Sequence, residues 1–206
     1  HIDHVKGAGV FSRKFDVPIY ATMETWDAME GILGKIAPRN KRFVYEGEPC
    51  VINDLCVKPF AIPHDAAAPV GYSVFAGEKK ITVATDIGHV TDIIRENITD
   101  SDILLLESNH DLRMLETGPY PYYLKRRIMG DFGHLSNENA GRLLNCILSG
   151  KMKHILLGHL SQENNMPELA YETVRLEVDM GDTPYQASDF YMAVARRDRM
   201  SDILTV

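Results

Sequence analysis

The first four residues, His1-Ile2-Asp3-His4, place two imidazoles and a carboxylate within one short stretch. Nitrogen and oxygen donors of this kind bind divalent transition metals such as Zn²⁺ or Mn²⁺, whereas an unpaired carboxylate is costly to bury in an apolar core. A short polar cluster at the start of a chain also suits a solvated tail. The cluster alone leaves both interpretations open, and the choice between them depends on which donors follow.

Three further donors each follow an apolar, strand-like run. His64 ends the run from Val57 to Pro63, Asp86 follows residues 81–85, and His159 follows residues 154–158. In α/β folds the carboxyl ends of the strands form the rim where ligands bind, so donors at such ends converge on one place. We therefore expect these three residues to join the opening cluster in a metal centre.

The order of these motifs resembles the metallo-β-lactamase superfamily, whose signature is His-x-His-x-Asp-His followed by a distant His, an Asp and a final His. The opening cluster matches the last four positions of the first motif. Residues 62–66, 85–89, 133–137 and 158–161 are most similar to the YycJ/WalJ-type branch, which consists of bacterial DNA exonucleases. The family's first ligand His and the strands before it are missing from residues 1–206. We therefore expect a single, N-terminally incomplete domain of this family over residues 1–206.

The resemblance implies an α/β fold, namely the family's αββα sandwich, with two divalent metal ions as cofactors, either Zn²⁺ or Mn²⁺. Paired metals lower the pKa of a bound water, so that a metal-bound hydroxide attacks the substrate near neutral pH. The implied ligands are His1 and His64 for the first metal, Asp3, His4 and His159 for the second, and Asp86 as the bridge between them.

His134 lies in the segment Gly133–Asn137, where a helix is expected to begin. Backbone N–H groups and the helix dipole favour a phosphate at such a position, and an imidazole there can protonate a leaving oxygen. We expect His134 to hold the substrate or act as a general acid, and we name Asp3, Asp86 and His134 as the catalytic residues. The alternative is a capping or packing histidine.

Further candidates for substrate binding lie on both sides of His134. Ser136 also suits the start of a helix, and Asn109 and His110 follow the strand-like run 102–107. Residues 120–127 combine three tyrosines with three cations, which suits single-stranded nucleic acid because bases stack on rings while cations contact phosphates. The alternative is a solvated helix start. From this stretch we select Tyr123, Lys125 and Arg126.

The composition is typical of a soluble globular protein, with 206 residues, 45% hydrophobic and 25% charged. The net charge of −7 argues against a protein that coats nucleic acid generally, but two bound divalent cations leave a nuclease possible. No apolar run reaches the roughly 18–20 residues that span a bilayer. The three cysteines lack CxxC spacing and are typical of free thiols in a reducing compartment, so we expect a cytoplasmic protein.

Strands and helices alternate along the chain and must position these residues. Strands are expected within residues 43–62, 70–85, 102–107, 153–160 and 190–195, and helices over 88–97, 136–150 and 167–180. An earlier helix is expected to turn Trp26, Met29, Ile32, Leu33 and Ile36 toward a core. Residues 109–134 are expected to form an irregular loop that carries specificity.

These observations predict a metal-dependent phosphodiesterase, most specifically a 5′-to-3′ DNA exonuclease that acts on single strands or 5′ ends. One alternative is a small-molecule hydrolase that cleaves a thioester or lactone at the same dinuclear site. The other is a non-catalytic scaffold or partner-binding protein, which only the shortened first motif supports.

Overall fold

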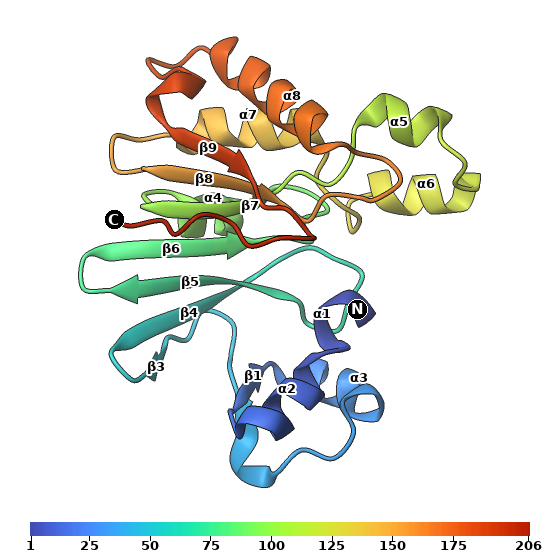
Figure 1. Ribbon diagram of the computed structural model, residues 1–206, viewed down its shortest axis with the longest axis vertical. Coiled ribbons are helices and arrows are strands. Elements are labelled where there is room, and N and C mark those ends of the chain that lie inside the picture. Colours follow the sequence, from blue (N-terminus) through green and yellow to red (C-terminus); the bar gives the residue numbers. More distant parts are fainter.

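A mixed β-sheet of seven strands runs through the protein, of which the computed structural model describes residues 1–206 (Figure 1). The strands follow one another across the sheet in chain order, from β3 to β9. Strands β3 to β6 pair antiparallel, whereas β6 to β9 run parallel. Their bounds are β3 Cys50–Ile52, β4 Leu55–Ala61, β5 Val70–Ala76, β6 Lys79–Ala84, β7 Ile103–Glu107, β8 His154–Gly158 and β9 Tyr191–Val194.

The strand sequences determine which face of the sheet is covered. Every second residue of β6 is buried, because successive side chains of a strand point to opposite faces. The apolar strand β7 is buried at four of its five positions, as expected in the middle of a sheet. All five predicted strand regions contain strands, and residues 43–62 contain both β3 and β4. Gly77, at φ 59°, makes the short turn between β5 and β6, where glycine adopts a positive φ without strain.

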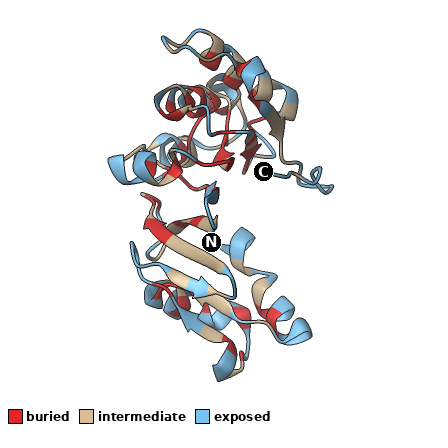
Figure 2. Cartoon of the chain, turned by 90° about the vertical axis from the view of Figure 1, so that its left-hand side faces the viewer, coloured by how far each residue is buried: buried red, intermediate tan, exposed pale blue.

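Three helices pack on one face of the sheet: α4 Asp92–Ile98, α7 Asn137–Ile147 and α8 Pro167–Asp179. They confirm the predicted helical regions 88–97, 136–150 and 167–180, and Pro167 opens α8 as expected. Their inward side chains join the sheet in a cluster of 20 buried residues. Figure 2 shows buried residues gathered where these helices meet the sheet. Members of the cluster include Leu104, Leu106, Ile155 and Leu157 from strands and Ile94, Leu144 and Val174 from helices.

The opposite face of the sheet is more open. Ile81 is 40% exposed, Val83 is 37% exposed and Tyr191 is 42% exposed. The segment that follows β9 turns back along this face, where Met200 and Leu204 border the same small cavity as Leu156 (Figure 1). The predicted α/β class is confirmed, with helices on one face of one large sheet.

Residues 1–43 form a smaller unit next to β3 and β4, with its own core (Figure 1). Its elements are α1 Ile2–Val5, α2 Ala8–Phe15, β1 Ile19–Ala21, α3 Met23–Leu33, the 3-10 helix η1 Pro38–Asn40 and β2 Lys41–Phe43. Strands β1 and β2 form a separate parallel pair. Because the chain has two hydrophobic clusters, the assignment of residues 1–206 to a single domain stays a prediction.

The predicted core stripe of α3 is largely confirmed. Trp26 is buried and its indole Nε1 donates a hydrogen bond to the carbonyl of Arg42 at 2.8 Å. Thr22 caps the helix by accepting from the backbone N–H of Thr25. The prediction for Ile32 is wrong, since its side chain is 47% exposed. Its position six residues after Trp26 turns it away from the face that Trp26 presents to the core.

The prediction that residues 109–134 form an irregular loop is wrong. This segment contains α5 Leu112–Thr117 and α6 Tyr122–Met129. Asp111 starts α5 by accepting a hydrogen bond from the backbone N–H of Met114 at 2.8 Å. Pro121 precedes α6, where a proline is compatible with the start of a helix. A second 3-10 helix, η2 Ala187–Asp189, leads into β9.

None of the helices is long and apolar enough to cross a lipid bilayer. All three cysteines have free thiols, as predicted.

The core packing predicts different outcomes for two leucines on neighbouring helices. Leu144 on α7 is 0% exposed, whereas Leu176 on α8 is 46% exposed. We expect Leu144→Ala to lower the free energy of unfolding by about 3 kcal/mol, because it leaves a cavity in the main core. The matched variant Leu176→Ala should lower it by less than about 1 kcal/mol. Urea unfolding of both variants checks this, and equal losses would contradict the described packing.

Candidate metal centre

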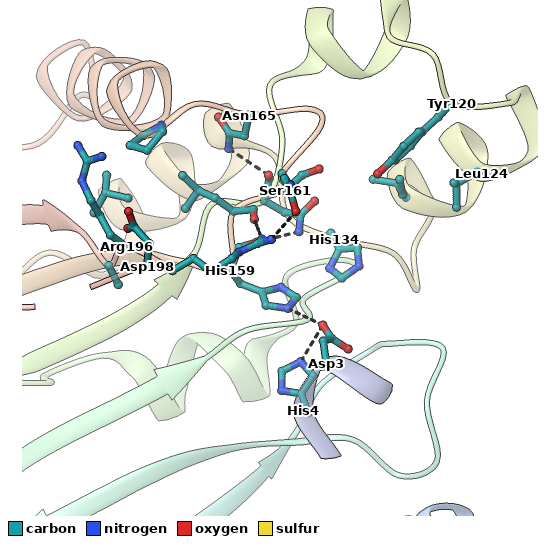
Figure 3. Close-up of a pocket in the computed structure, with 18 of the residues that line it drawn as sticks. Asp3, His4, Tyr120, Leu124, His134, His159, Ser161, Asn165, Arg196 and Asp198 are labelled. Carbon is teal, nitrogen blue, oxygen red and sulfur yellow. Dashed lines mark hydrogen bonds and ion pairs between the residues drawn. The ribbon is translucent and has the colours of Figure 1, made fainter. Parts of the chain in front are cut away.

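The predicted donors gather at one edge of the sheet, where β4, β6, β7 and β8 end (Figures 1 and 3). Strand β4 points the same way as β6 because both pair antiparallel with β5. His159 follows β8 directly, Asp86 lies just beyond β6, and His64 lies just beyond β4. Helix α1 brings the opening cluster to the same edge, so residues far apart in the sequence meet there.

Two of these donors sit at sharp backbone bends. Asp86 has φ 61° and His159 has φ 58°, in the left-handed region that few non-glycine residues adopt. Each such conformation costs about 1–3 kcal/mol and persists only where the surrounding structure imposes it. The bends end the strands abruptly and turn both side chains toward the centre.

The carboxylate of Asp86 lies in the middle of the donors. Its Oδ2 is 3.0 Å from Nε2 of His4, and its Oδ1 is 3.3 Å from Nε2 of His64. The same Oδ1 lies 3.8 Å from Nε2 of His159. The side chain of Asp86 thus touches both predicted ligand sets, which is the position that a bridging carboxylate needs.

The remaining donors form two groups on either side of Asp86. In one group, ligand atoms of His1, His64 and Asp65 lie within 4.8 Å of one another, with His1 Nε2 3.1 Å from Asp65 Oδ1. In the other, those of Asp3, His4 and His159 do the same, with Asp3 Oδ2 3.4 Å from His159 Nε2. Each group combines nitrogen and oxygen donors, so the chemistry and placement of the donors fit two transition-metal ions.

The sequence analysis missed the role of Glu107, the last residue of β7. Glu107 is fully buried, and its Oε1 is hydrogen-bonded to Nδ1 of His134 at 2.9 Å and to Nδ1 of His159 at 2.8 Å. Its Oε2 accepts from the backbone N–H groups of Ile87 at 2.8 Å and Leu135 at 2.9 Å. Glu107 therefore fixes both imidazole rings and the segments that follow Asp86 and His134.

Negative charge dominates the electrostatics of the centre. Burial disfavours the charged form of His159, but its hydrogen bond to Glu107 and the charge of Asp86 outweigh this and raise the pKa of His159 to about 9. The hydrogen bond to Asp86 likewise raises the pKa of His4. Burial opposes ionisation of Asp86, but its bond with His4 and the nearby His159 hold the pKa of Asp86 below its usual value. The centre thus stabilises positive charge, which a bound metal supplies once the imidazoles are neutral.

His134 lies among the same donors, and its ligand atom is within 4.8 Å of those of Asp86, Glu107 and His159. Its Nδ1 is held by Glu107, and its ring centroid lies 4.8 Å from that of His64 and 5.4 Å from that of His159. Its Nε2 makes no hydrogen bond within the protein. The histidine also lines the large cavity beside the donors (Figure 3).

That cavity has a volume of about 1010 Å³ and is bounded by three parts of the chain. One wall is the metal centre itself, formed by Asp3, His4, His134 and His159. The other two walls come from residues 120–128 and from the segments that follow β8 and β9. Asn109, a predicted substrate residue, also lines it. Its side-chain amide donates to the carbonyl of His159 at 2.9 Å, so Asn109 also supports the backbone of a predicted ligand.

Two predicted substrate residues lie beneath the cavity instead of lining it. Ser136 is 2% exposed, and its hydroxyl caps α7 by accepting from the backbone N–H of Asn139. His110 is 1% exposed, and burial lowers its pKa to about 4, which keeps the ring neutral. For both residues the structure supports a structural role.

The other three predicted substrate residues lie on α6 and point away from the cavity. Tyr123 is 75% exposed, Arg126 lies over the ring of Tyr122, and the ammonium group of Lys125 donates to the carbonyls of Glu116 and Gly118. None of these side chains lines the cavity. Its wall is formed instead by Tyr120, Leu124, Arg127 and Ile128 (Figure 3).

Arg127 was not selected from the sequence, yet it reaches the metal centre. Its Nη2 donates to Oδ1 of Asp65 at 2.8 Å, and its Nε donates to Oδ2, so the two side chains form a bidentate pair. The same Asp65 contacts His1. The pairing lowers the pKa of Asp65 and anchors α6 against the segment that carries His64.

Comparison with known proteins places this arrangement in a family. The family model described as Beta-lactamase superfamily domain matches residues 1–157. The chain is 42% identical over 175 residues to exodeoxyribonuclease YycJ of Bacillus anthracis, covering 84% of this chain and 66% of that protein. It is 39% identical over 176 residues to exodeoxyribonuclease WalJ of Streptococcus pneumoniae, covering 84% and 65%. The chain thus spans about two thirds of the length of these curated relatives.

Solved structures of low sequence identity share the fold. The metallo-β-lactamase fold protein YhfI of Bacillus subtilis matches with a TM-score of 0.61 at 13% identity, over 95% of this chain and 72% of that one. Zn²⁺-bound PqqB of Methylobacterium extorquens matches with a TM-score of 0.61 at 18% identity, over 94% and 66%. These matches confirm the predicted metallo-β-lactamase fold, of which residues 1–206 form one large mixed sheet with helices on one face.

The contacts of Glu107 predict that it controls metal affinity without binding metal itself. We expect Glu107→Gln to weaken Zn²⁺ or Mn²⁺ binding by about 10–100-fold, because the His134 and His159 rings lose the carboxylate that orients them. Calorimetric titration of the metal-free protein measures this.

A second buried carboxylate, at the opposite end of β7 from Glu107, provides the control. Asp102 lies before β7, at the end remote from the donors, and accepts from the backbone N–H of Lys80 at 2.9 Å. Asp102→Asn should reduce thermal stability but leave metal affinity unchanged. Equal metal affinity in the wild type and Glu107→Gln would show that Glu107 does not orient the ligands.

Proposed function

Since the chain belongs to the β-lactamase superfamily, we propose that it is a metal-dependent phosphodiesterase, specifically a DNA exonuclease that works from the 5′ end. The observation that carries this proposal is the meeting of two donor groups at Asp86, on one side of a large open cavity. The two relatives named as exodeoxyribonucleases support DNA as the substrate.

The proposed metal ligands follow from the two donor groups. His1 and His64 would hold one ion, and Asp3, His4 and His159 would hold the other, with Asp86 as the carboxylate between the two sets. Zn²⁺ and Mn²⁺ both suit this mixture of imidazole and carboxylate. When bound, such ions lower the pKa of water and neutralise charge on a phosphate. The protein orients the donors through Glu107 and through the bends at Asp86 and His159.

His134 is the proposed general acid. Glu107 holds its Nδ1, which directs Nε2 away from this carboxylate, and the ring borders the cavity. The Nε2 atom can therefore carry a proton to the oxygen that leaves when the phosphodiester is cleaved.

We also propose that the protein acts in the cytoplasm. The support is the predicted use of its cysteines as free thiols, which a reducing compartment maintains.

Cleavage of end-labelled DNA tests the proposed activity. We expect the metal-loaded protein to release a labelled mononucleotide from 5′-labelled DNA before shorter fragments accumulate. Asp86→Asn should lower the rate by more than about 100-fold, because it removes the bridging charge while asparagine tolerates the left-handed backbone. The exposed Asp182→Asn is the matched control and should retain wild-type activity.

Other results of this assay contradict separate parts of the proposal. Stoichiometric metal binding without cleavage of DNA, together with hydrolysis of a thioester or lactone, would establish a small-molecule hydrolase. Absence of metal binding would show that the ligand assignment is wrong and would favour a scaffold protein. A ladder of labelled fragments would reverse the proposed polarity.

The proposed role of His134 predicts a dependence on the leaving group. His134→Gln should lower kcat on DNA by about 10²–10⁴-fold, because the leaving 3′-oxygen needs a proton. A p-nitrophenyl ester of thymidine 5′-phosphate has a leaving group that departs without protonation, so its cleavage should fall far less. Equal losses on both substrates would assign His134 a role in binding instead of proton transfer.

A further inference from the structure

We propose that Arg196 and Arg197, which follow β9, form a second phosphate-binding subsite in the cavity. A single nucleic-acid strand is then held at two places at once, at the metal centre and at this distal arginine pair. The inference rests on the proposed function and deepens it, because it makes a polynucleotide strand the preferred substrate over a single small ester.

The position of the pair is the first support. Arg196 and Arg197 line the same cavity as His134 and His159, and Arg197 donates to the carbonyl of Leu160, the residue after His159, at 2.8 Å. Figure 3 shows Arg196 on the side of β9, Tyr120 and Leu124 on the opposite side, and His159 between them. A strand that reaches the donors therefore has a continuous lined path toward the arginines.

The size of the cavity is the second support. At about 1010 Å³ it reaches the upper end of the volumes that enclose small ligands, roughly 300–1,000 Å³. Tyr120 provides an aromatic ring on the wall, and stacking of a base on such a ring is independent of sequence. The space and the ring suit more than one nucleotide.

Charge is the third support. The chain as a whole has a net charge of −7, yet three arginines line the cavity, against two carboxylates, Asp3 and Asp198. Arg127 is already paired with Asp65, so Arg196 and Arg197 are the cations of the wall that remain for a substrate phosphate. The planar guanidinium matches two oxygens of a phosphate better than an ammonium group does.

Both arginines of the pair are available to a phosphate. Arg196 pairs at 3.0 Å with Glu168, whose side chain is 74% exposed, and exposed ion pairs of this kind contribute little to stability. Arg197 donates only to neutral acceptors, namely Gln162 Oε1 at 3.1 Å and the carbonyl of Leu160 at 2.8 Å. Its charge has no carboxylate partner, so an approaching phosphate supplies one.

Salt-dependent binding tests the subsite directly. The probe is a fluorescent, phosphorothioate-linked single strand of about 12 nucleotides, which resists cleavage by the metal-loaded protein. We expect Arg196→Gln/Arg197→Gln to raise Kd by at least roughly tenfold at low salt. The slope of log Kd against log salt should fall by about 0.7 for each lost phosphate contact.

The control variant removes two arginines that have similar ion pairs elsewhere. Arg95 pairs with Asp92 on α4, and Arg142 pairs with Glu177 between α7 and α8. Arg95→Gln/Arg142→Gln makes the same change in net charge but should leave both Kd and the slope unchanged. Arg196→Lys/Arg197→Lys should preserve most of the slope, which a purely structural role of the two side chains does not predict.

Kinetics separate this inference from the proposed function. The glutamine double variant should lose at least roughly tenfold in kcat/KM on the long strand but stay within about twofold of wild type on thymidine 5′-p-nitrophenyl phosphate, which has a single phosphodiester. Equal losses on both substrates, or an unchanged salt slope, would overturn the subsite. A wild type that binds the strand with the expected slope but cleaves no phosphodiester would instead overturn the proposed function and leave the subsite standing.

Discussion

One buried carboxylate, that of Glu107, joins the parts of the protein that must meet at the metal centre. It lies at the end of a central strand and accepts four hydrogen bonds, two from imidazoles and two from backbone N–H groups. A buried charge is stable only when every lone pair is satisfied, and removal of its partners is strongly destabilising. The two oxygens of Glu107 therefore position the rings of His134 and His159 together with the segments that follow Asp86 and His134.

The meeting of His64, Asp86 and His159 was predictable from the sequence because its signal is local. A donor that directly follows an apolar run marks the end of a strand, and the carboxyl ends of parallel strands lie at the same edge of a sheet. The sequence alone therefore predicts that His64, Asp86 and His159 lie close together. Glu107 also ends such a run. However, the alternation of side chains along a strand does not reveal whether a carboxylate at its end is buried or solvent-exposed. Its role depends on contacts with residues 27 and 52 positions away, which no local pattern encodes.

The cavity wall shows a different limit of sequence analysis. The aromatic and cationic composition of residues 120–127 led to the prediction that they contact the substrate. Three residues of this stretch line the cavity, but the side chains selected from the sequence are their neighbours along the chain. Leu124 and Arg127 are three residues apart and share a face of α6, and Tyr120 precedes the helix on the same side, whereas Tyr123 and Arg126 lie outside the cavity. Which side chains share a face can be predicted only when the segment is known to be helical. This stretch was instead predicted to be an irregular loop.

The bends at Asp86 and His159 restrict how this centre can change during evolution. In the left-handed backbone region only glycine and, less readily, asparagine, aspartate and histidine are well tolerated. The few residues that keep the bend at Asp86 while altering the side chain, such as asparagine, remove its charge. Glutamate would keep the charge but fits the bend less well. A single substitution at Asp86 therefore loses either the fit to the backbone bend or the negative charge of the side chain.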